Sequence, residues 1–378
     1  MPDHSPSTPH RHGGNRQERA EALGCKPAEL LDLSASLVPF GPPSWLPLAL
    51  RRAIANELTP YPDRRYANLR AQIASHHGLD PDWVLPGNGA AELFTWAARD
   101  SAAFHSLLPQ PGFNDYCRAL DCWHGRWQAL PLQLEWAAAF PQAFTAALTT
   151  PLRADPGRAL WITNPHNPSG QLWCRKSLEL LLPQFGLVVV DEAFLTLLPN
   201  GEQQSLVPLI NKYPNLVVVR SLTKLFAIAG LRLGYAIAHP DRLASWASWR
   251  DPWPVNGLAA ALGGALLADQ NWAKRVQQWL AKEGPWLYQQ LQQLDGIRPM
   301  PSAANYLLIH GAHSLEPLRL ALEQQHHILL RDCRSFIGLD DHYLRIALSD
   351  RNRNRRLIKA LGAAANCLDE KSVNALSF

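Results

Sequence analysis

A lysine that could act as a nucleophile lies at position 224, shortly after the apolar run LVVV at residues 216–219. A lysine held against a buried strand has its pKa lowered by desolvation, which favours Schiff-base formation. Ser221 and Thr223 precede it, and Arg232 follows in the segment GLRLGY. Their hydroxyl and guanidinium groups could bind a phosphate. A lone lysine of this kind can equally be a solvated surface residue, so the assignment needs support from other segments.

A second segment with phosphate-binding character is PGNGAAE, which contains Gly89, Ala90 and Ala91 and leads into a helical pattern. Small residues at a helix N-terminus expose backbone N–H groups and the positive end of the helix dipole, which suits a phosphate. The alternative is a glycine-rich turn that only caps the helix.

Two further polar side chains follow apolar runs. Asn167 lies in NPHNPSG after residues 159–163, and the prolines of that segment restrict the loop that holds it. Its amide could donate to a phenolate oxygen, although the segment could also be a simple turn. Asp191 follows residues 186–190. A carboxylate at the end of a buried strand needs a partner, which could be a pyridinium nitrogen, a structural salt bridge or a helix cap.

The four segments together supply an amine for an aldehyde, a carboxylate for a ring nitrogen, a donor for a ring oxygen and a cradle for a phosphate. Those are the groups that pyridoxal 5′-phosphate (PLP) requires. The combination therefore predicts a PLP site with Lys224 and Asp191 as its catalytic residues.

The elements that must position these groups form an α/β pattern. The apolar runs at residues 159–163, 186–190 and 216–219 are separated by helical stretches, which predicts a large lobe with a mostly parallel sheet flanked by helices. Ligands of such sheets bind at the carboxyl ends of the strands. Helical patterns at 258–269 and 271–294, followed by strand patterns at 305–310 and 343–348, predict a smaller α+β lobe.

The expected organisation has four parts. Residues 1–11 are predicted to be disordered, and residues 12–60 to pack with the small lobe. Residues 61–255 would form the large PLP-binding domain, and residues 256–378 the small C-terminal domain.

The composition is that of a globular enzyme, with 378 residues, 47% hydrophobic and 18% charged. A net charge of +4 gives no reason to expect nucleic acid or a membrane surface as a partner, but it suits an anionic small ligand. No apolar stretch is long enough to span a bilayer, and the polar N-terminus lacks a signal region. The six cysteines form no CxxC pair or metal-ligand spacing. We therefore expect a cytoplasmic protein with reduced thiols and no metal site.

The motifs NPHNPSG, DEAF and SLTKLFAIAGLRLGY resemble those of the fold-type-I PLP enzymes, the aspartate aminotransferase superfamily. Within it, the chain resembles the branch that holds histidinol-phosphate aminotransferases and threonine-phosphate decarboxylases of cobalamin biosynthesis. The resemblance runs from residue 12 to about residue 361. The opening HGGN and the element RDC at 331–333 make the decarboxylases the closer match.

This resemblance implies roles for the cofactor residues. Lys224 would form the Schiff base, Asp191 would keep the pyridine nitrogen protonated, and Asn167 would bond the phenolic oxygen. Either Phe113 or Tyr116 would stack on the ring. The cofactor phosphate would be held by Gly89, Ala90, Ala91, Ser221, Thr223 and Arg232.

The resemblance also implies a small phosphorylated amino acid as substrate and a homodimer with its sites near the subunit boundary. The substrate's carboxylate and phosphate would be contacted by His12, Gly13, Ser36, Asn167, Arg331 and Arg345, with the two arginines not told apart.

The sequence departs from the family pattern SANINP, which here reads SASLVP at residues 34–39. Ser36 and Val38 replace the two asparagines, and Phe194 replaces a tyrosine of many aminotransferases. Decarboxylation of L-threonine O-3-phosphate is the expected activity. An aminotransferase acting on histidinol phosphate or a related amine is the alternative. A non-catalytic PLP-fold regulator is disfavoured because Lys224 is present.

Overall fold

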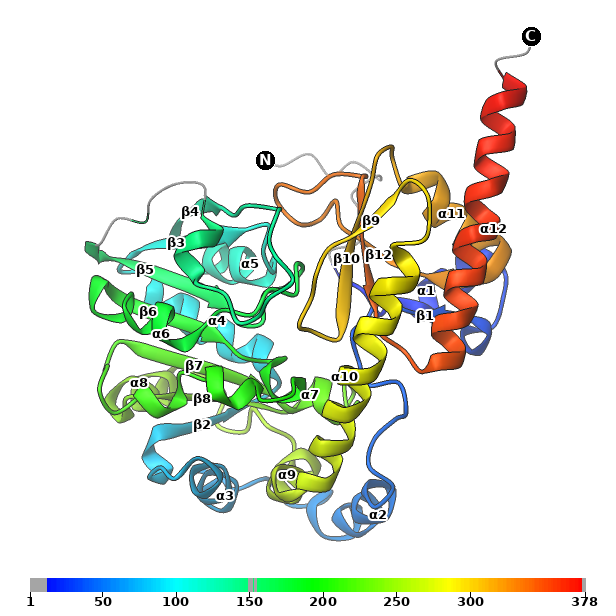
Figure 1. The fold of residues 1–378 in the computed structure, drawn as a ribbon. Coiled ribbons are helices and arrows are strands. Elements are labelled where there is room, and N and C mark those ends of the chain that lie inside the picture. The colour runs from blue at the N-terminus through cyan, green and yellow to red at the C-terminus, as the bar shows by residue number, and fades with distance from the viewer. Residues whose placement is uncertain (1–11, 149–151, 153–154, 376–378) are drawn as a thin grey trace.

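A seven-stranded sheet forms the centre of the larger lobe (Figure 1). The structure is a computed structural model that describes residues 12–148, 152 and 155–375. Strand β8 pairs antiparallel with β2 and β7, whereas the other strand pairs of this sheet are parallel. The predicted mostly parallel sheet is therefore confirmed. In spatial order the strands are β2 (Val84–Gly87), β8 (Gly234–Ala238), β7 (Leu216–Ser221), β6 (Phe185–Asp191), β5 (Asp155–Thr163), β3 (His105–Gln110) and β4 (Arg126–Pro131).

Helices cover both faces of this sheet, which explains why its central strands are apolar without alternation. Val189 and Val217 pack into a core with helices on one face, whereas Val188 and Val218 pack into a larger core on the other. The first core contains residues of α4 (Ala90–Ser101), α5 (Asp115–Cys122) and α8 (Pro240–Trp249). The second contains residues of α2 (Leu46–Glu57), α3 (Ala67–His77), α6 (Arg175–Glu179), α7 (Leu222–Leu225), α9 (Gly257–Ala268) and α10 (Gln270–Leu291).

A four-stranded antiparallel sheet and two helices form the smaller lobe (Figure 1). The strand order is β12 (Arg331–Asp332), β13 (Tyr343–Ala347), β10 (Tyr306–Gly311) and β9 (Ile297–Pro299), with α11 (Glu316–His326) and α12 (Arg351–Ala375) beside it. This part confirms the predicted α+β lobe.

The N-terminal segment is attached to the smaller lobe by a short parallel pair. Helix α1 (Arg16–Leu23) and the 3-10 turn η1 (Pro27–Glu29) lead into β1 (Leu31–Asp32), which pairs with β11 (Ile328–Leu329). Leu33 O then accepts a hydrogen bond from Ala347 N at 2.9 Å. The boundaries at residues 60 and 255 stay predictions, and the predicted disorder of residues 1–11 lies outside the described residues.

The remaining short elements are 3-10 turns in the large lobe. They are η2 (Pro81–Trp83), η3 (Phe144–Ala147), η4 (Leu182–Gln184), η5 (Leu195–Leu197), η6 (Gly201–Gln204) and η7 (Val207–Leu209).

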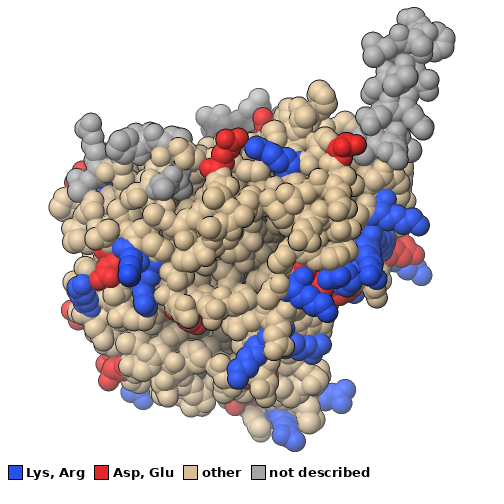
Figure 2. Space-filling view, viewed as in Figure 1, with Lys and Arg blue, Asp and Glu red and all other residues tan. Residues whose placement is uncertain are grey.

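The face shown in Figure 2 carries scattered charges of both signs, with Lys and Arg gathered over α12. Part of that charge is neutralised within the fold, because Arg351 pairs with the buried carboxylate of Glu283 on α10. In the described part of the chain, no helix combines the length and the apolar content needed to cross a membrane.

Candidate active site

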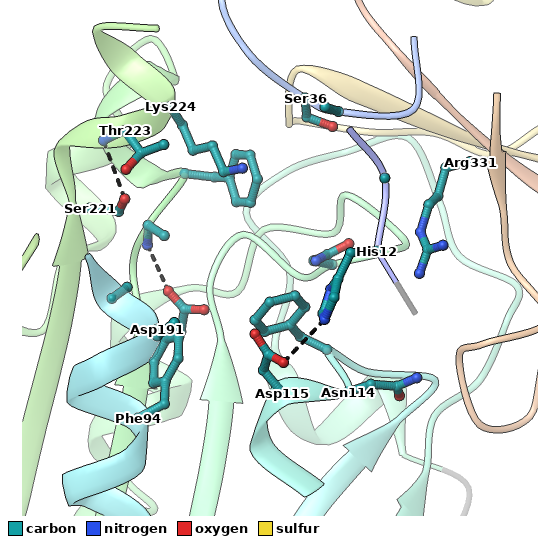
Figure 3. Close-up of a pocket in the computed structure, with 18 of the residues that line it drawn as sticks. His12, Ser36, Phe94, Asn114, Asp115, Asp191, Ser221, Thr223, Lys224 and Arg331 are labelled. Atoms are coloured by element: carbon teal, nitrogen blue, oxygen red, sulfur yellow. Dashed lines mark hydrogen bonds and ion pairs between the residues drawn. The ribbon is translucent and has the colours of Figure 1, made fainter. Parts of the chain in front are cut away.

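A cavity of about 320 Å³ lies at the carboxyl ends of β5, β6 and β7, where the large sheet faces the small lobe and the N-terminal segment. Figure 3 shows Lys224, Ser221, Thr223 and Asp191 on one side of this space and Ser36, Arg331 and His12 on the other. Of the predicted site residues, all line the cavity except Gly89 and Tyr116. The predicted residues that line the cavity are His12, Gly13, Ser36, Ala90, Ala91, Phe113, Asn167, Asp191, Ser221, Thr223, Lys224, Arg232, Arg331 and Arg345.

Lys224 projects into the cavity from α7, which begins directly after β7. Ser221 is the N-cap of this short helix, and its hydroxyl accepts a hydrogen bond from Thr223 N at 3.3 Å. Burial lowers the pKa of Lys224 to about 8, and the guanidinium groups of Arg345 and Arg232 lower it in the same direction. Near physiological pH this amine is therefore neutral, and able to react as a nucleophile, much more often than an ordinary lysine.

Asp191 lies at the end of β6 and is held by two donors. Its Oδ1 accepts from Ala193 N at 2.9 Å, and its Oδ2 accepts from the Tyr116 hydroxyl at 2.5 Å. Burial raises the pKa of Asp191 to about 6, while these two hydrogen bonds and the nearby Lys224 oppose the rise. The carboxylate is thus poised to accept a cationic N–H partner from the cavity.

Of the two candidates for the stacking residue, Phe113 lines the cavity and Tyr116 does not. Tyr116 is buried behind the cavity with its ring edge-on to that of Phe113. The Tyr116 hydroxyl also lies 2.9 Å from Thr163 Oγ1. Phe113 is therefore the residue placed to contact a ring in the cavity, and Tyr116 is placed to orient Asp191.

Glu192, next in the chain, faces away from the cavity. It is fully buried, its Oε2 lies 2.7 Å from Arg220 Nη2, and it accepts from Ser205 Oγ and Leu206 N. Neighbouring side chains of a strand point to opposite faces. Asp191 therefore faces the cavity, and Glu192 belongs to a structural ion pair.

Gly89, Ala90 and Arg232, which are predicted to hold the cofactor phosphate, meet at the N-terminus of α4. Gly89 is its N-cap with φ of 76°, and no side chain caps the helix. A Cβ at Gly89 would lie 2.6 Å from Arg232 Nη2, so the glycine makes room for the guanidinium over the helix N-terminus. Gly89 thus shapes the site without lining the cavity.

Two arginines of the small lobe face the cavity. The buried Arg345 of β13 donates from Nη1 to Asn167 Oδ1 and from Nη2 to Ser34 O at 3.1 Å. Arg331 of β12 donates to Ser335 Oγ at 2.5 Å. Burial and the neighbouring Arg345 lower the pKa of Arg331 to about 10, which leaves it charged at neutral pH. The pairing of β12 with β13 places these residues directly opposite each other.

The N-terminal segment closes one side of the cavity. His12 Nε2 lies 3.3 Å from the Asp115 carboxylate, and Gly14 N donates to Ser34 Oγ at 2.9 Å. A Cβ at Gly13 would lie 2.3 Å from Ser34 O, so only glycine fits there without a shift. Ser36 is 2% exposed, and its Oγ has no hydrogen-bond partner within the described chain.

Sequence reasoning missed several lining residues. Asn114 and Asp115 lie after β3, at the same sheet edge as the predicted loops, so their position after a strand was the available signal. Phe94 and Phe336 were missed because an apolar residue in a helix or loop carries no comparable signal.

Comparison with known proteins identifies the family. The model of the family described as aminotransferase class I and II matches residues 28–361. The chain belongs to this family. A threonine-phosphate decarboxylase from Salmonella typhimurium is 35% identical over 361 residues, which cover 93% of this chain and 95% of that protein.

Two other proteins are similar to this chain. A histidinol-phosphate aminotransferase from Symbiobacterium thermophilum is 34% identical over 342 residues, or 89% of this chain and 91% of that protein. The structure of a histidinol-phosphate aminotransferase from Sinorhizobium meliloti, solved in complex with PLP, matches with a TM-score of 0.79. It is 21% identical, covers 94% of this chain and 95% of that one, and supports the fold.

The residues of this aminotransferase-family cavity fit the cofactor expected from the sequence. The uncapped N-terminus of α4 and Arg232 offer donors to a phosphate. Asp191 presents its carboxylate to the cavity, and Lys224 presents an amine whose pKa is lowered. The donors and acceptors therefore match the phosphate, the ring nitrogen and the aldehyde of PLP.

Proposed function

We propose that this protein is a PLP-dependent threonine-phosphate decarboxylase that converts L-threonine O-3-phosphate to (R)-1-amino-2-propanol O-2-phosphate in cobalamin biosynthesis. Membership of the aminotransferase family confirms the predicted cofactor, PLP. The observation that carries the substrate proposal is the pair Arg331 and Arg345, which line the same cavity as Lys224. Figure 3 shows Arg331 on the opposite side of that cavity from Lys224.

The charges of the substrate match this pair. A carboxylate and a phosphate monoester bring close to three negative charges near neutral pH. The phosphate of the cofactor is assigned to Arg232 and α4, so Arg331 and Arg345 are left for the substrate. Planar guanidinium groups bind both anions with defined geometry. His12 and the unpartnered hydroxyl of Ser36 lie on the same side.

The residues divide the chemistry between them. PLP, when bound, withdraws electrons from the Cα of the amino acid joined to it. Asp191 holds the proton on the ring nitrogen, and Asn167 hydrogen-bonds the ring oxygen while it accepts from Arg345. Arg331 and Arg345 orient the substrate so that its carboxylate leaves as CO2. Lys224 or water then delivers the proton that replaces it at Cα.

Aminotransfer on histidinol phosphate or a related donor is the second candidate. Two observations favour it: the Symbiobacterium relative is nearly as similar as the decarboxylase, and Ser36 stands where the decarboxylase pattern has asparagine. A serine hydroxyl is shorter and lacks the paired donor and acceptor of an amide.

One experiment separates the two. The PLP-loaded protein is incubated with L-threonine O-3-phosphate, and released CO2 and keto acid are measured together. The proposal predicts CO2 and the amino alcohol phosphate without keto acid. A second reaction with histidinol phosphate and 2-oxoglutarate should give no glutamate. Keto acid in the first reaction, or glutamate in the second, would establish the aminotransferase instead.

The lysine assignment has its own test. The PLP-loaded protein should show a visible absorbance band that borohydride removes, leaving the cofactor attached to the chain. Lys224→Ala should bind PLP through the α4 cradle but release it after the same treatment. Retention of covalent cofactor by Lys224→Ala would move the Schiff base to another lysine.

We also propose a homodimer that acts in the cytoplasm. Apolar side chains of α2 and the segment after it are exposed, with Leu58 at 66% and Tyr61 at 78%. A second copy of the chain would cover such a surface. Sedimentation of the purified protein should give twice the mass of the chain.

A further inference from the structure

Three side chains that can bind a metal ion meet outside the cavity, where the N-terminal segment joins the small lobe. The ligand atoms of Cys25, Glu29 and His327 all lie within 4.8 Å of one another. Cys25 follows the end of α1, Glu29 is the last residue of η1, and His327 is the C-cap of α11. We propose that these three residues bind one divalent cation of the zinc class and that this ion fixes the N-terminal segment to the small lobe.

The types of ligand select the class of metal. A thiolate, an imidazole and a carboxylate form a mixed soft and intermediate set that suits Zn²⁺, whereas Mg²⁺ and Ca²⁺ prefer oxygen ligands. Three protein ligands leave the fourth tetrahedral position for water. The other cluster of this kind in the described residues, Asp340, Asp341 and His342, is a run of neighbouring and largely exposed groups and carries no proposal.

The backbone around each ligand is fixed by hydrogen bonds. Gly24 has φ of 65° and ends α1, so that Cys25 N bonds Ala20 O at 3.0 Å. Glu29 Oε2 accepts from Lys26 N at 2.8 Å, which orients the carboxylate and leaves its second oxygen available.

His327 is held in the same way from the small lobe. Its backbone is left-handed with φ of 54°, its N–H bonds Leu322 O, and its carbonyl accepts from Leu31 N at 2.8 Å. Zinc bonds of about 2.0–2.3 Å place tetrahedral ligand atoms about 3.3–3.8 Å apart. The ligand atoms already lie within 4.8 Å of one another, so the side chains would have to draw together by only about 1–1.5 Å at most.

The position of the site links it to the cavity. Arg19 of α1 forms an ion pair with Glu323 of α11, and β1 pairs with β11, so α1 and β1 lie beside the small lobe (Figure 1). Cys25 packs beside a small buried cluster of Ala20, Leu30 and Leu329, which joins the two parts. The chain just before α1 carries His12 and Gly13 to the cavity. A bound ion would therefore hold these cavity residues in place from the far end of α1.

Zinc binding to the full-length, PLP-loaded protein tests this proposal. The protein is reduced, treated with chelator and dialysed against Zn²⁺, and the metal per chain is measured by atomic emission. We expect one equivalent for the wild type. Cys25→Ser and His327→Gln should lose it, whereas the matched controls Cys122→Ser, at an exposed thiol, and His326→Gln, at the adjacent ring, should keep it.

Two further measurements test the same site: the Zn²⁺ affinity of a Glu29 variant and the hydrogen exchange of the N-terminal segment. Glu29→Gln changes an exposed side chain and should bind Zn²⁺ on the order of tenfold or more weakly, since even outer groups of a metal site have effects of that size. Amide hydrogen exchange of residues 16–29 should slow with Zn²⁺ in the wild type but not in Cys25→Ser. A wild type that binds no Zn²⁺, or Cys25→Ser and His327→Gln variants that bind it as the wild type does, would overturn the proposal.

Discussion

Replacement of Tyr116 by phenylalanine should change the acidity of Asp191 without changing the shape of the cavity. The Tyr116 hydroxyl donates to Asp191 Oδ2 at 2.5 Å, and the ring packs behind the cavity wall. A hydrogen bond to a charged group contributes about 1.5–3 kcal/mol. One pKa unit corresponds to about 1.36 kcal/mol, so the loss should shift the ionisation of Asp191 by about 1–2 pH units.

The direction of the change follows from which form the bond stabilises. The hydroxyl donates to the ionised carboxylate, so its removal favours the protonated form and raises the pKa of Asp191. Protonated Asp191 cannot hold the proton on the cofactor ring nitrogen. The acidic limb of kcat/KM against pH should therefore move to higher pH by that amount, while the rate on the alkaline side of the limb changes little.

Tyr235→Phe is the matched control. Tyr235 is equally buried on β8, and its hydroxyl lies 3.0 Å from His77 Nε2, outside the set of cavity-lining residues. Its loss should lower Tm by a similar amount to that of Tyr116→Phe and leave the pH profile unchanged. An unshifted acidic limb in Tyr116→Phe, or equal shifts in both variants, would refute the assignment of Tyr116 to Asp191.

The remaining predictions concern the two carboxylates and the substrate side. Asp191→Asn should abolish turnover and keep Tm near that of the wild type. Glu192→Gln should lower the free energy of unfolding by about 3 kcal/mol through loss of a buried ion pair, and should still bind PLP. Thermal unfolding and CO2 release would give the opposite results if the two carboxylates have exchanged roles. Arg331→Lys and Arg345→Lys should each reduce kcat/KM for threonine phosphate about 10- to 100-fold, including a fall in kcat, and normal turnover in both would contradict the substrate site. Ser36→Asn should retain or improve decarboxylation, and a PLP-bound variant without turnover would remove the support for this substrate.

The strands that carry the site could be found from the sequence because each is buried on both faces. The apolar runs at 159–163, 186–190 and 216–219 became β5, β6 and β7. The reversed direction of β8 was not accessible, since its apolar run would look the same in either direction. The helix predicted over 271–294 became α10, which ends at Leu291 and continues through Pro285.

The site was predictable where side chains follow strands, and less so where contacts depend on distant packing. Lys224, Asp191 and Asn167 follow β7, β6 and β5, and all three line one cavity. Tyr116 could be selected as aromatic and close to the ring, but only the fold shows its hydroxyl on Asp191. The meeting of Cys25 with His327 was equally hidden, because it depends on the parallel pairing of β1 with β11.

The attachment of the N-terminal segment to the small lobe has an evolutionary consequence. Through β1, β11 and the Leu33–Ala347 bond, Ser36 belongs to the same structural unit as Arg331 and Arg345, while Lys224 belongs to the large sheet. Asn305 donates to Ser36 O and Arg331 donates to Ser335 Oγ within this unit, whereas Arg345 reaches across to Asn167 of the large lobe. A lineage could therefore exchange the molecule it processes, and the bond it breaks, by altering one half of the cavity while the machinery inherited for the cofactor stays intact.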